Sequence, residues 1–348
     1  LSVIKKTVDG LSNADEIEFI SFSSAMHGTM AVDENGKPLT PLMTWADKRS
    51  KKIAADLLTS DNGKNIWLQT GTPVHAMTPL CKIKWIKEND PCVFKKAYKF
   101  IGIKEYIFYK LFNKYVIDYS LASATGLLDI NALNWYEPSL RFTGIEKNKL
   151  STLVSVFHTE TAIEKKYVDQ LGLRKDVPFI IGASDGCLAN LGSGVLLPSE
   201  AALTIGTSGA IRRTIQKPEV DKKQRLFTYY LADNLFVQGG ATNNGGNVLQ
   251  YWMENHLHGA GDLNKIIDHT FTVSPGCNGL VCLPYFFGER APVWDADAKP
   301  VFSGAADKHT ELHFVRAIIE GVCFTFKQLL HALEENENAI DCIYASGG

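Results

Sequence analysis

One aspartate at the end of an apolar run is the residue of this sequence best placed to do chemistry. Residues 180–182 are apolar or small and predict a buried strand, and Asp185 follows them with Gly on both sides of it. Residues 187–191 then predict a helix. Ligands bind at the carboxyl ends of strands in open α/β sheets, so a carboxylate delivered there can accept a proton from a bound hydroxyl. Taken alone, such an Asp would be interpreted as a cap or turn residue.

A glycine-rich turn with two hydroxyl side chains follows Asp185 along the chain. Gly206, Thr207 and Ser208 lie between two expected strands, residues 201–205 and 210–215. Glycine lets backbone N–H groups converge on an anion, and the Thr and Ser hydroxyls add donors. The turn is neither a Walker A loop, since no Lys follows, nor a dinucleotide-binding fingerprint. Alone it would be read as a plain hairpin turn, but together with Asp185 it indicates a phosphate site.

A carboxylate and a phosphate-binding turn are two of the parts that phosphoryl transfer needs. That reaction requires a carboxylate to orient or deprotonate the attacking hydroxyl, donors around the phosphates and a divalent metal. Asp185 can supply the first, and Thr207 and Ser208 the second. No dedicated set of Asp and Glu ligands is visible, so the chemistry, and not a protein metal site, implies Mg²⁺.

The composition predicts a two-domain globular protein. The chain has 348 residues, of which 45% are apolar, and this length favours two domains. The net charge of −2 gives no electrostatic argument for nucleic acid or for an anionic membrane. The seven cysteines are scattered without metal-ligand spacing, which indicates reduced thiols in the cytoplasm. No apolar run approaches membrane-spanning length, and no signal peptide is expected.

The sequence is expected to be cut at both ends. It begins at Leu1 within a helical pattern and stops at Gly347 and Gly348, directly after a strand-like segment. A change in composition places the expected boundary between domains of residues 1–197 and 198–348. The functional predictions therefore concern the intact protein.

An imidazole after an expected strand and an indole at the start of an expected helix together suggest a sugar site in the first domain. His27 follows the strand-like residues 17–23, and residues 29–33 are expected to form the second strand of a hairpin-like unit. Trp45 lies at the start of an expected helix, residues 44–58. Aromatic faces cover the apolar side of a polyol while polar groups bond its hydroxyls. Singly, each residue is as well explained by the surface or the core.

Two further segments match signatures of a known family. The first is Met77-x-Pro79-x-x-Lys82-Ile83-x-Trp85, and the second is Phe302-x-Gly304 followed by His313-Phe314-x-x-Ala317-Ile318-Ile319-Glu320. These residues resemble the FGGY carbohydrate kinases, which belong to the actin and hexokinase superfamily. The second signature departs at Pro300 and Ala305. The resemblance covers essentially the whole chain and implies an α/β, two-domain actin/hexokinase-like (RNase H-like) fold with an interdomain cleft.

Within the family, the similarity is strongest to the branch that phosphorylates gluconate. It is carried by residues 22–27, 118–126, 184–192 and 239–246. The implied reaction is the ATP-dependent phosphorylation of a terminal hydroxyl of an open-chain sugar acid, gluconate to 6-phosphogluconate. Xylulose kinases share the triplet at residues 26–28 and are the alternative, as is a catalytically silent sugar-binding relative.

The resemblance also implies a role for each candidate residue. Asp185 is the base that accepts the proton of the sugar hydroxyl. The residues implied to lie at the sugar are Met26, His27, Trp45, His75 and Met77. The residues implied to bind the nucleotide are Gly206, Thr207, Ser208, Asn244, Gly304, Gly347 and Gly348. The expected ligands are a sugar or sugar acid and ATP with Mg²⁺, in a cytoplasmic enzyme for which a homodimer is considered.

The carboxylate of gluconate needs a side chain in the site that binds it. It must stay away from Asp185, because two anions in a poorly hydrated site repel each other. His27, His75 and Lys82 are the candidates, and His27 is preferred because it ends a strand in the same layer as Asp185. Xylulose carries no charge and needs no such cation.

Overall fold

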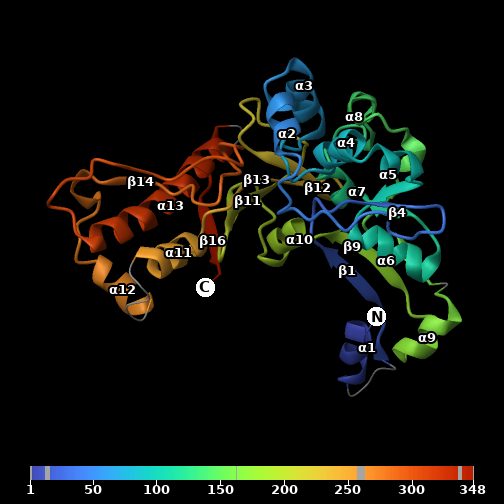
Figure 1. Ribbon diagram of the computed structural model, residues 1–348. Coiled ribbons are helices and arrows are strands. Elements are labelled where there is room, and N and C mark those ends of the chain that lie inside the picture. The colour runs from blue at the N-terminus through green and yellow to red at the C-terminus, as the bar shows by residue number, and fades with distance from the viewer. Residues whose placement is uncertain (1, 12–15, 162, 257–262, 336–338, 348) are drawn as a thin grey trace. The chain divides into compact units, whose positions relative to one another are not determined.

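The computed structural model describes residues 2–11, 16–161, 163–256, 263–335 and 339–347 (Figure 1). It divides into two compact units. The first is Leu1–Ala189 together with Tyr229–Phe236, and the second is Asn190–Thr228 together with Val237–Gly348. The first unit therefore includes a short segment from the second half of the sequence.

The first unit combines many short helices with small sheets. Its helices are α1 (Ser2–Asp9), α2 (Lys51–Leu58), α3 (Asp61–Thr70), α4 (Pro79–Asn89), α5 (Pro91–Lys96), α6 (Ile103–Phe112), α7 (Tyr119–Ser123), α8 (Glu137–Thr143), α9 (Lys165–Leu171) and the start of α10 (Asp185–Gly192). Its strands are β1 (Ile20–Ser24), β2 (Met30–Val32), β3 (Lys99–Ile101), β4 (Val116–Asp118), β5 (Leu128–Asp129), β6 (Asn134–Trp135), β7 (Thr152–Val154), β8 (Thr159–Glu160) and β9 (Phe179–Ser184).

β9, the strand that precedes Asp185, lies in the middle of a three-stranded sheet with the order β1-β9-β8. Figure 1 shows β1 beside β9. β1 runs parallel to β9, and the register pairs Ser24 with Ser184, so both strands end at the same edge. Phe179 and Ile181 of β9 are fully buried in a core that also contains Phe108 of α6. The predicted buried strand ending at Asp185 is thus confirmed.

β9 contains a bulge three residues before Asp185. The pairs Ser21–Ile180 and Ser23–Ala183 leave one residue of β1 opposite two residues of β9. Gly182 lies in this bulge with a φ of 66°, and a Cβ there would lie 2.0 Å from the carbonyl oxygen of Phe22. Only glycine combines this dihedral angle with so close a backbone contact.

Two local expectations for the first unit are wrong. The hairpin-like unit of residues 17–33 does not form, because β1 pairs with β9 whereas β2 pairs antiparallel with β3. The helix expected over residues 44–58 begins only at Lys51. Asp47 accepts a hydrogen bond from the backbone N–H of Arg49, and such local side-chain bonds compete with helix formation.

α6 begins with a buried carboxylate, that of Glu105. Its side chain accepts a hydrogen bond from the backbone N–H of Gly102, and the residue is only 5% exposed. Burial raises the pKa of Glu105 from 4.5 to about 7. The folded chain therefore binds this proton more tightly than the unfolded chain does.

The protein is accordingly expected to lose stability as the pH rises from about 4.5 to 7, by up to about 1.4 kcal/mol per pH unit. The contribution is fully present below pH 4.5, the ordinary Glu pKa, and is lost above the folded pKa of about 7. Glu105→Gln keeps the acceptor oxygen and should flatten this part of the melting temperature against pH. Glu137→Gln, at a carboxylate whose side chain is 67% exposed, is the control and should leave the curve unchanged. A Glu105→Gln curve that still follows the wild type would contradict this linkage.

The second unit is built on a five-stranded sheet with the order β12-β13-β11-β10-β16. Its strands are β10 (Glu200–Ile205), β11 (Gly209–Ile215), β12 (Phe227–Ala232), β13 (Leu235–Thr242) and β16 (Cys342–Ser346), and the ends of β12 and β13 that face their turn belong to the first unit. The remaining elements are α11 (Gly246–His256), α12 (Leu263–Thr270), α13 (Glu311–Glu334), β14 (Val281–Leu283) and β15 (Val301–Ser303).

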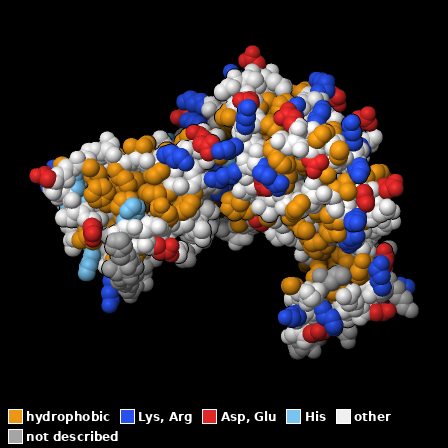
Figure 2. Space-filling model, in the orientation of Figure 1, with side chains coloured by type: hydrophobic (Ala, Val, Ile, Leu, Met, Phe, Trp, Pro, Cys, Tyr) orange, Lys and Arg blue, Asp and Glu red, His pale blue; other side chains and the backbone are white. Residues whose placement is uncertain are grey.

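The ribbon of β14 and β15 has one covered and one open face. Cys282 is buried with Val248 of α11 and Ile318 of α13. Its neighbours Val281 and Leu283 point the other way and are 47% and 45% exposed. Figure 2 shows hydrophobic side chains gathered over the part of the molecule where β14 and α13 lie in Figure 1. The long helix expected from Leu312 onward is confirmed as α13.

Candidate active site

Asp185 is an exposed carboxylate at the end of a buried strand. It begins α10 directly after β9, and Ser184 before it is fully buried. Its Oδ1 accepts a hydrogen bond from the backbone N–H of Gly186 at 2.7 Å. One carboxylate oxygen is therefore held by the backbone, and the side chain remains accessible to a ligand.

His27 follows β1, the parallel neighbour of β9, so it and Asp185 leave the sheet at the same edge. Its φ of 66° is rare for a residue with a side chain. The residue is 9% exposed, and Nδ1 lies 2.8 Å from the carbonyl oxygen of Ala124. Because a carbonyl can only accept, Nδ1 carries a proton, and the neutral ring presents an acceptor at Nε2.

His75 has the opposite tautomer. Its Nδ1 accepts a hydrogen bond from the backbone N–H of Met77 at 3.3 Å, so the neutral ring carries its proton on Nε2. His75 and Met77 are 7% and 3% exposed and lie just before α4, whereas Met26 is half-buried. Trp45 is 45% exposed. The two histidines thus differ in what they offer a sugar at neutral pH.

Lys82 of α4 ties the loops of this site together. Its Nζ donates to the carbonyl oxygens of His27, Met43 and Thr44 at 2.7, 3.1 and 2.7 Å, and the residue is 0% exposed. Burial lowers its pKa to about 7, and the charge of Asp47 opposes this shift. An ammonium group has three N–H donors, and here all three go to the backbone. The suggestion that Lys82 receives a substrate carboxylate is therefore wrong.

In the second unit, the glycine-rich turn joins β10 to β11 as expected. Gly206 donates its backbone N–H to the carbonyl oxygen of Ser208 at 2.9 Å, and Thr207 is exposed. The start of α11 packs against this turn, because the N–H of Gly246 donates to the Gly206 carbonyl at 2.7 Å. A Cβ at Gly245 would lie 2.7 Å from the same oxygen. Two small-residue loops far apart in the sequence are therefore in contact.

Gly347 lies beside the strand that leads into the Gly206 turn, whereas Gly304 lies beside Gly279. β16 runs parallel to β10 with Ser346 opposite Thr204, and a Cβ at Gly347 would lie 1.9 Å from the carbonyl oxygen of Ile205. Gly304 follows β15, and a Cβ there would lie 2.2 Å from the carbonyl oxygen of Gly279. Gly348 lies outside the described residues.

Asn244 is held by a carboxylate that the sequence did not single out. Its amide Nδ2 donates to the carbonyl of Gly288 at 2.8 Å and to Glu289 Oε2 at 3.1 Å. Glu289 is 0% exposed and also accepts from Thr242 Oγ1 at 2.7 Å and from the N–H of Asn243 at 3.0 Å. Burial raises the pKa of Glu289 above its ordinary value, although these hydrogen bonds oppose the shift. The sequence feature that could have indicated Glu289 is its position as an acidic residue inside an aromatic- and proline-rich loop.

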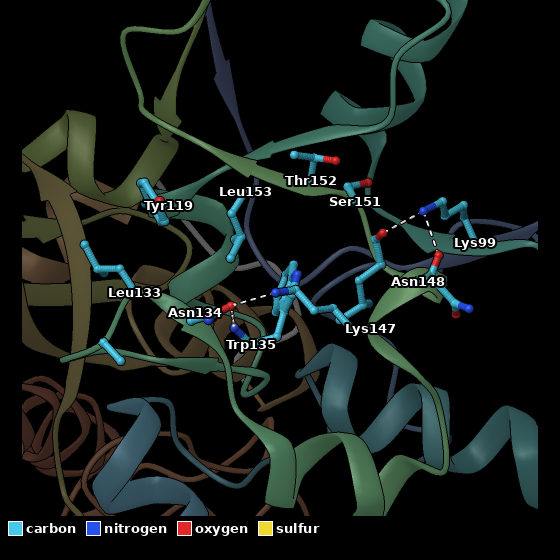
Figure 3. A pocket seen from close by; sticks show the side chains of 12 residues that line it. Lys99, Tyr119, Leu133, Asn134, Trp135, Lys147, Asn148, Ser151, Thr152 and Leu153 are labelled. Atoms are coloured by element: carbon cyan, nitrogen blue, oxygen red, sulfur yellow. Dashed lines mark hydrogen bonds between the residues drawn. The ribbon is translucent and has the colours of Figure 1, made fainter.

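A separate hollow of about 720 Å³ in the first unit contains none of the predicted site residues (Figure 3). Its wall includes Lys99, whose Nζ donates to the carbonyls of Asn148 and Leu150, and Lys147, whose Nζ donates to Asn134 Oδ1. These bonds tie the lysines to the wall itself. In the described part of the chain, no group of three or more His, Cys, Asp or Glu could hold a metal ion.

An exposed carboxylate at the same sheet edge as His27, and a glycine-rich turn between two strands of a second α/β unit, are the arrangement expected of a sugar phosphotransferase. Comparison with known families agrees. Residues 1–192 match the N-terminal domain of the FGGY family of carbohydrate kinases, and residues 201–348 match its C-terminal domain. The chain belongs to this family and has its two-domain, actin/hexokinase-like α/β fold.

Several individual relatives within this family are similar to the chain. A gluconokinase from Bacillus subtilis (strain 168) is 45% identical over 343 residues, which cover 95% of this chain and 67% of that protein. A gluconate kinase structure from Lactobacillus acidophilus has a TM-score of 0.93 at 34% identity and covers 99% of this chain and 70% of the other. A ligand-bound xylulose kinase structure from the same organism also has a TM-score of 0.93, at 35% identity, covering 100% and 70%.

The chain spans about two thirds of the length of the curated relatives that it matches. None of the helices in the described residues is long and apolar enough to cross a membrane.

Proposed function

We propose that the protein transfers the γ-phosphoryl group of ATP to the terminal hydroxyl of gluconate, giving 6-phosphogluconate and ADP. The observation that carries the proposal is Asp185, an exposed carboxylate at the same sheet edge as His27. The 45% identity to a gluconokinase supports the choice of sugar.

Asp185 acts as the general base in this proposal. It accepts the proton of the hydroxyl whose oxygen attacks the γ-phosphorus, while the bond from that phosphorus to the β–γ bridging oxygen breaks and ADP leaves. Trp45 and Met77 contribute apolar contacts along the carbon chain of the sugar, and Met26 lies in the loop of His27. Lys82 keeps the loops of His27 and Thr44 in place through the backbone.

The nucleotide is assigned to the second unit. Gly206, Thr207 and Ser208 would supply backbone and hydroxyl donors to its phosphates, with Gly347 beside them, while Asn244 would act by holding its loop through Glu289. Gly304 and Gly348 are assigned to the same nucleotide by family resemblance alone. Mg²⁺ suits a site in which ATP brings most of the ligands, since this ion commonly binds phosphate oxygens and one or two carboxylates. When bound, it neutralises charge on the β- and γ-phosphates.

The alternative substrate is xylulose, which the similarity to a xylulose kinase structure supports. The cytoplasm is the proposed location. The seven scattered cysteines of the sequence favour this location, because thiols stay reduced in the cytoplasm.

The different tautomers of His27 and His75 lead to different expected pH dependences of KM for gluconate and for xylulose. His27 must bind a second proton before Nε2 can donate to a carboxylate, whereas neutral His75 can already donate through Nε2. We therefore expect gluconate to have the higher kcat/KM, and its KM to rise by about 10-fold as the pH passes through the ordinary histidine range. The KM for xylulose should stay flat.

The measurement is initial rate against sugar concentration between pH 6 and 8, about the range in which histidine titrates. His27→Gln should remove the pH dependence of the gluconate KM. His75→Gln should raise that KM equally at each pH. A preference for xylulose would move the assignment to the alternative, and a gluconate KM indifferent to both substitutions would exclude the histidines from the site.

A further inference from the structure

A lysine is buried beneath Asp185. Lys104 lies near the start of α6, with its side chain 1% exposed. Its Nζ donates to Asp118 Oδ2 at 2.8 Å and to the carbonyl oxygen of Ala183 at 3.0 Å. Removing an ammonium group from water is costly, so such a residue needs partners.

Both residues that precede Asp185 are held by hydrogen bonds from buried side chains. Lys104 binds the carbonyl of Ala183, and the backbone N–H of Ser184 donates to Ser120 Oγ at 3.2 Å. The hydroxyl oxygens of Ser120 and Ser184 lie 2.9 Å apart. The chain that leaves β9 is therefore anchored on two consecutive residues, while the next residue, Asp185, is exposed.

Asp118 holds the lysine and the serine in one assembly. Its Oδ2 binds Lys104, and its Oδ1 accepts the backbone N–H of Leu121 at 2.9 Å, which caps α7, the helix that carries Ser120. Asp118 is 0% exposed. α6, α7 and the end of β9 thus meet around one buried ion pair.

The charge of Lys104 also acts on Asp185. Burial lowers the pKa of Lys104, whereas Asp118, Glu105 and Asp185 raise it through their charges. Such an interaction is mutual, so a cation that is favoured by the Asp185 carboxylate also favours the ionised form of that carboxylate.

We propose that Lys104, held by Asp118, is a positioning residue for phosphoryl transfer. It fixes the backbone beneath Asp185 and keeps that carboxylate ready to accept a proton. The proposal rests on the proposed function, in which Asp185 is the base.

The test must separate this role from simple stabilisation of the core. Lys104→Met alone would leave Asp118 buried and unpaired, which is strongly destabilising. The double variant Lys104→Met/Asp118→Asn removes both charges, and Asn keeps an oxygen to cap α7. The matched control is Lys114→Met/Glu160→Gln, because Glu160 pairs with Lys114 at 2.8 Å and lies opposite Phe179, at the other end of β9.

With the intact enzyme, the Lys104 double variant should lower kcat by about 10- to 100-fold while changing the sugar KM little. The acid limb of its kcat profile should move upward by a few tenths of a pH unit, because the lost Lys104 cation acts on Asp185 and loss of the Asp118 anion offsets only part of this effect. The control should keep the wild-type kcat and profile. Ser120→Ala, which adds no unpaired charge, should lower kcat by about 3- to 10-fold without moving the profile.

Wild-type kcat and an unmoved profile in the Lys104 double variant would overturn the proposal, as would an equal loss in the Lys114 control. If the Lys104 double variant does not fold, Ser120→Ala becomes the test. An unchanged kcat in Ser120→Ala would contradict the proposal that this assembly positions Asp185. Failure of the wild type itself to phosphorylate gluconate, xylulose or glycerol would overturn the proposed function instead.

Discussion

Replacement of Asp185 by Asn is expected to lower kcat by about 10²–10⁴-fold, the usual contribution of a general base. The amide has the shape of the carboxyl group, and its oxygen can still accept the N–H of Gly186, which Oδ1 accepts at 2.7 Å. What the substitution removes is the proton acceptor. The sugar KM should therefore change little, and the melting temperature should stay within about 2 °C.

Asp176→Asn is the control for this prediction. Asp176 is another aspartate of the first unit, its side chain is 82% exposed, and it lies before β9 instead of after it. Its substitution should leave kcat unchanged. An Asp185→Asn enzyme that turns over within a few-fold of the wild type would exclude Asp185 as the base.

Gly182→Ala is expected to destabilise the protein by about 2–5 kcal/mol. A left-handed conformation costs about 1–2 kcal/mol for a residue with a Cβ, and overpacking adds about 1–3 kcal/mol. The added Cβ would meet the Phe22 carbonyl oxygen at 2.0 Å, and a backbone atom of a paired strand cannot easily move away. The bulge lies three residues before Asp185, so kcat should fall together with the melting temperature.

Gly172→Ala separates the two causes. Gly172 has a φ of 70°, and a Cβ added there would meet no atom within 4 Å, so only the conformational cost of about 1–2 kcal/mol remains. Melting curves and kcat for both variants provide the comparison. If the two variants melt at the same temperature, contact with Phe22 does not constrain the bulge.

Local pattern was enough to place the strand that ends at Asp185 and the hairpin around the Gly206 turn. In both places an apolar run ends in small residues, and that signal lies within a few positions of the chain. The pairing of β1 with β9 was not predictable in this way, because Ser24 and Ser184 are distant in sequence and no local feature specifies the partner.

The buried charges were missed for a related reason. Lys82 and Lys104 lie on helices, where a lysine normally points to solvent. Their partners are largely backbone carbonyls, those of His27, Met43, Thr44 and Ala183, and every residue has a carbonyl. Residue types therefore carry no sign of such contacts. For Lys82, the family signature marked the position but not what the side chain does.

The segment Tyr229–Phe236 has a consequence for exchanging parts between members of the family. It falls within the C-terminal family domain, residues 201–348, yet it completes the first unit. The Tyr229 ring lies 5.9 Å from that of His27, and the N–H of Tyr230 donates to Ser123 Oγ at 2.9 Å. A chimaera joined between the family domains would place a foreign tyrosine hairpin beside His27. Its sugar preference is then expected to shift, although every residue of the N-terminal half that is proposed to bind the sugar would be unchanged.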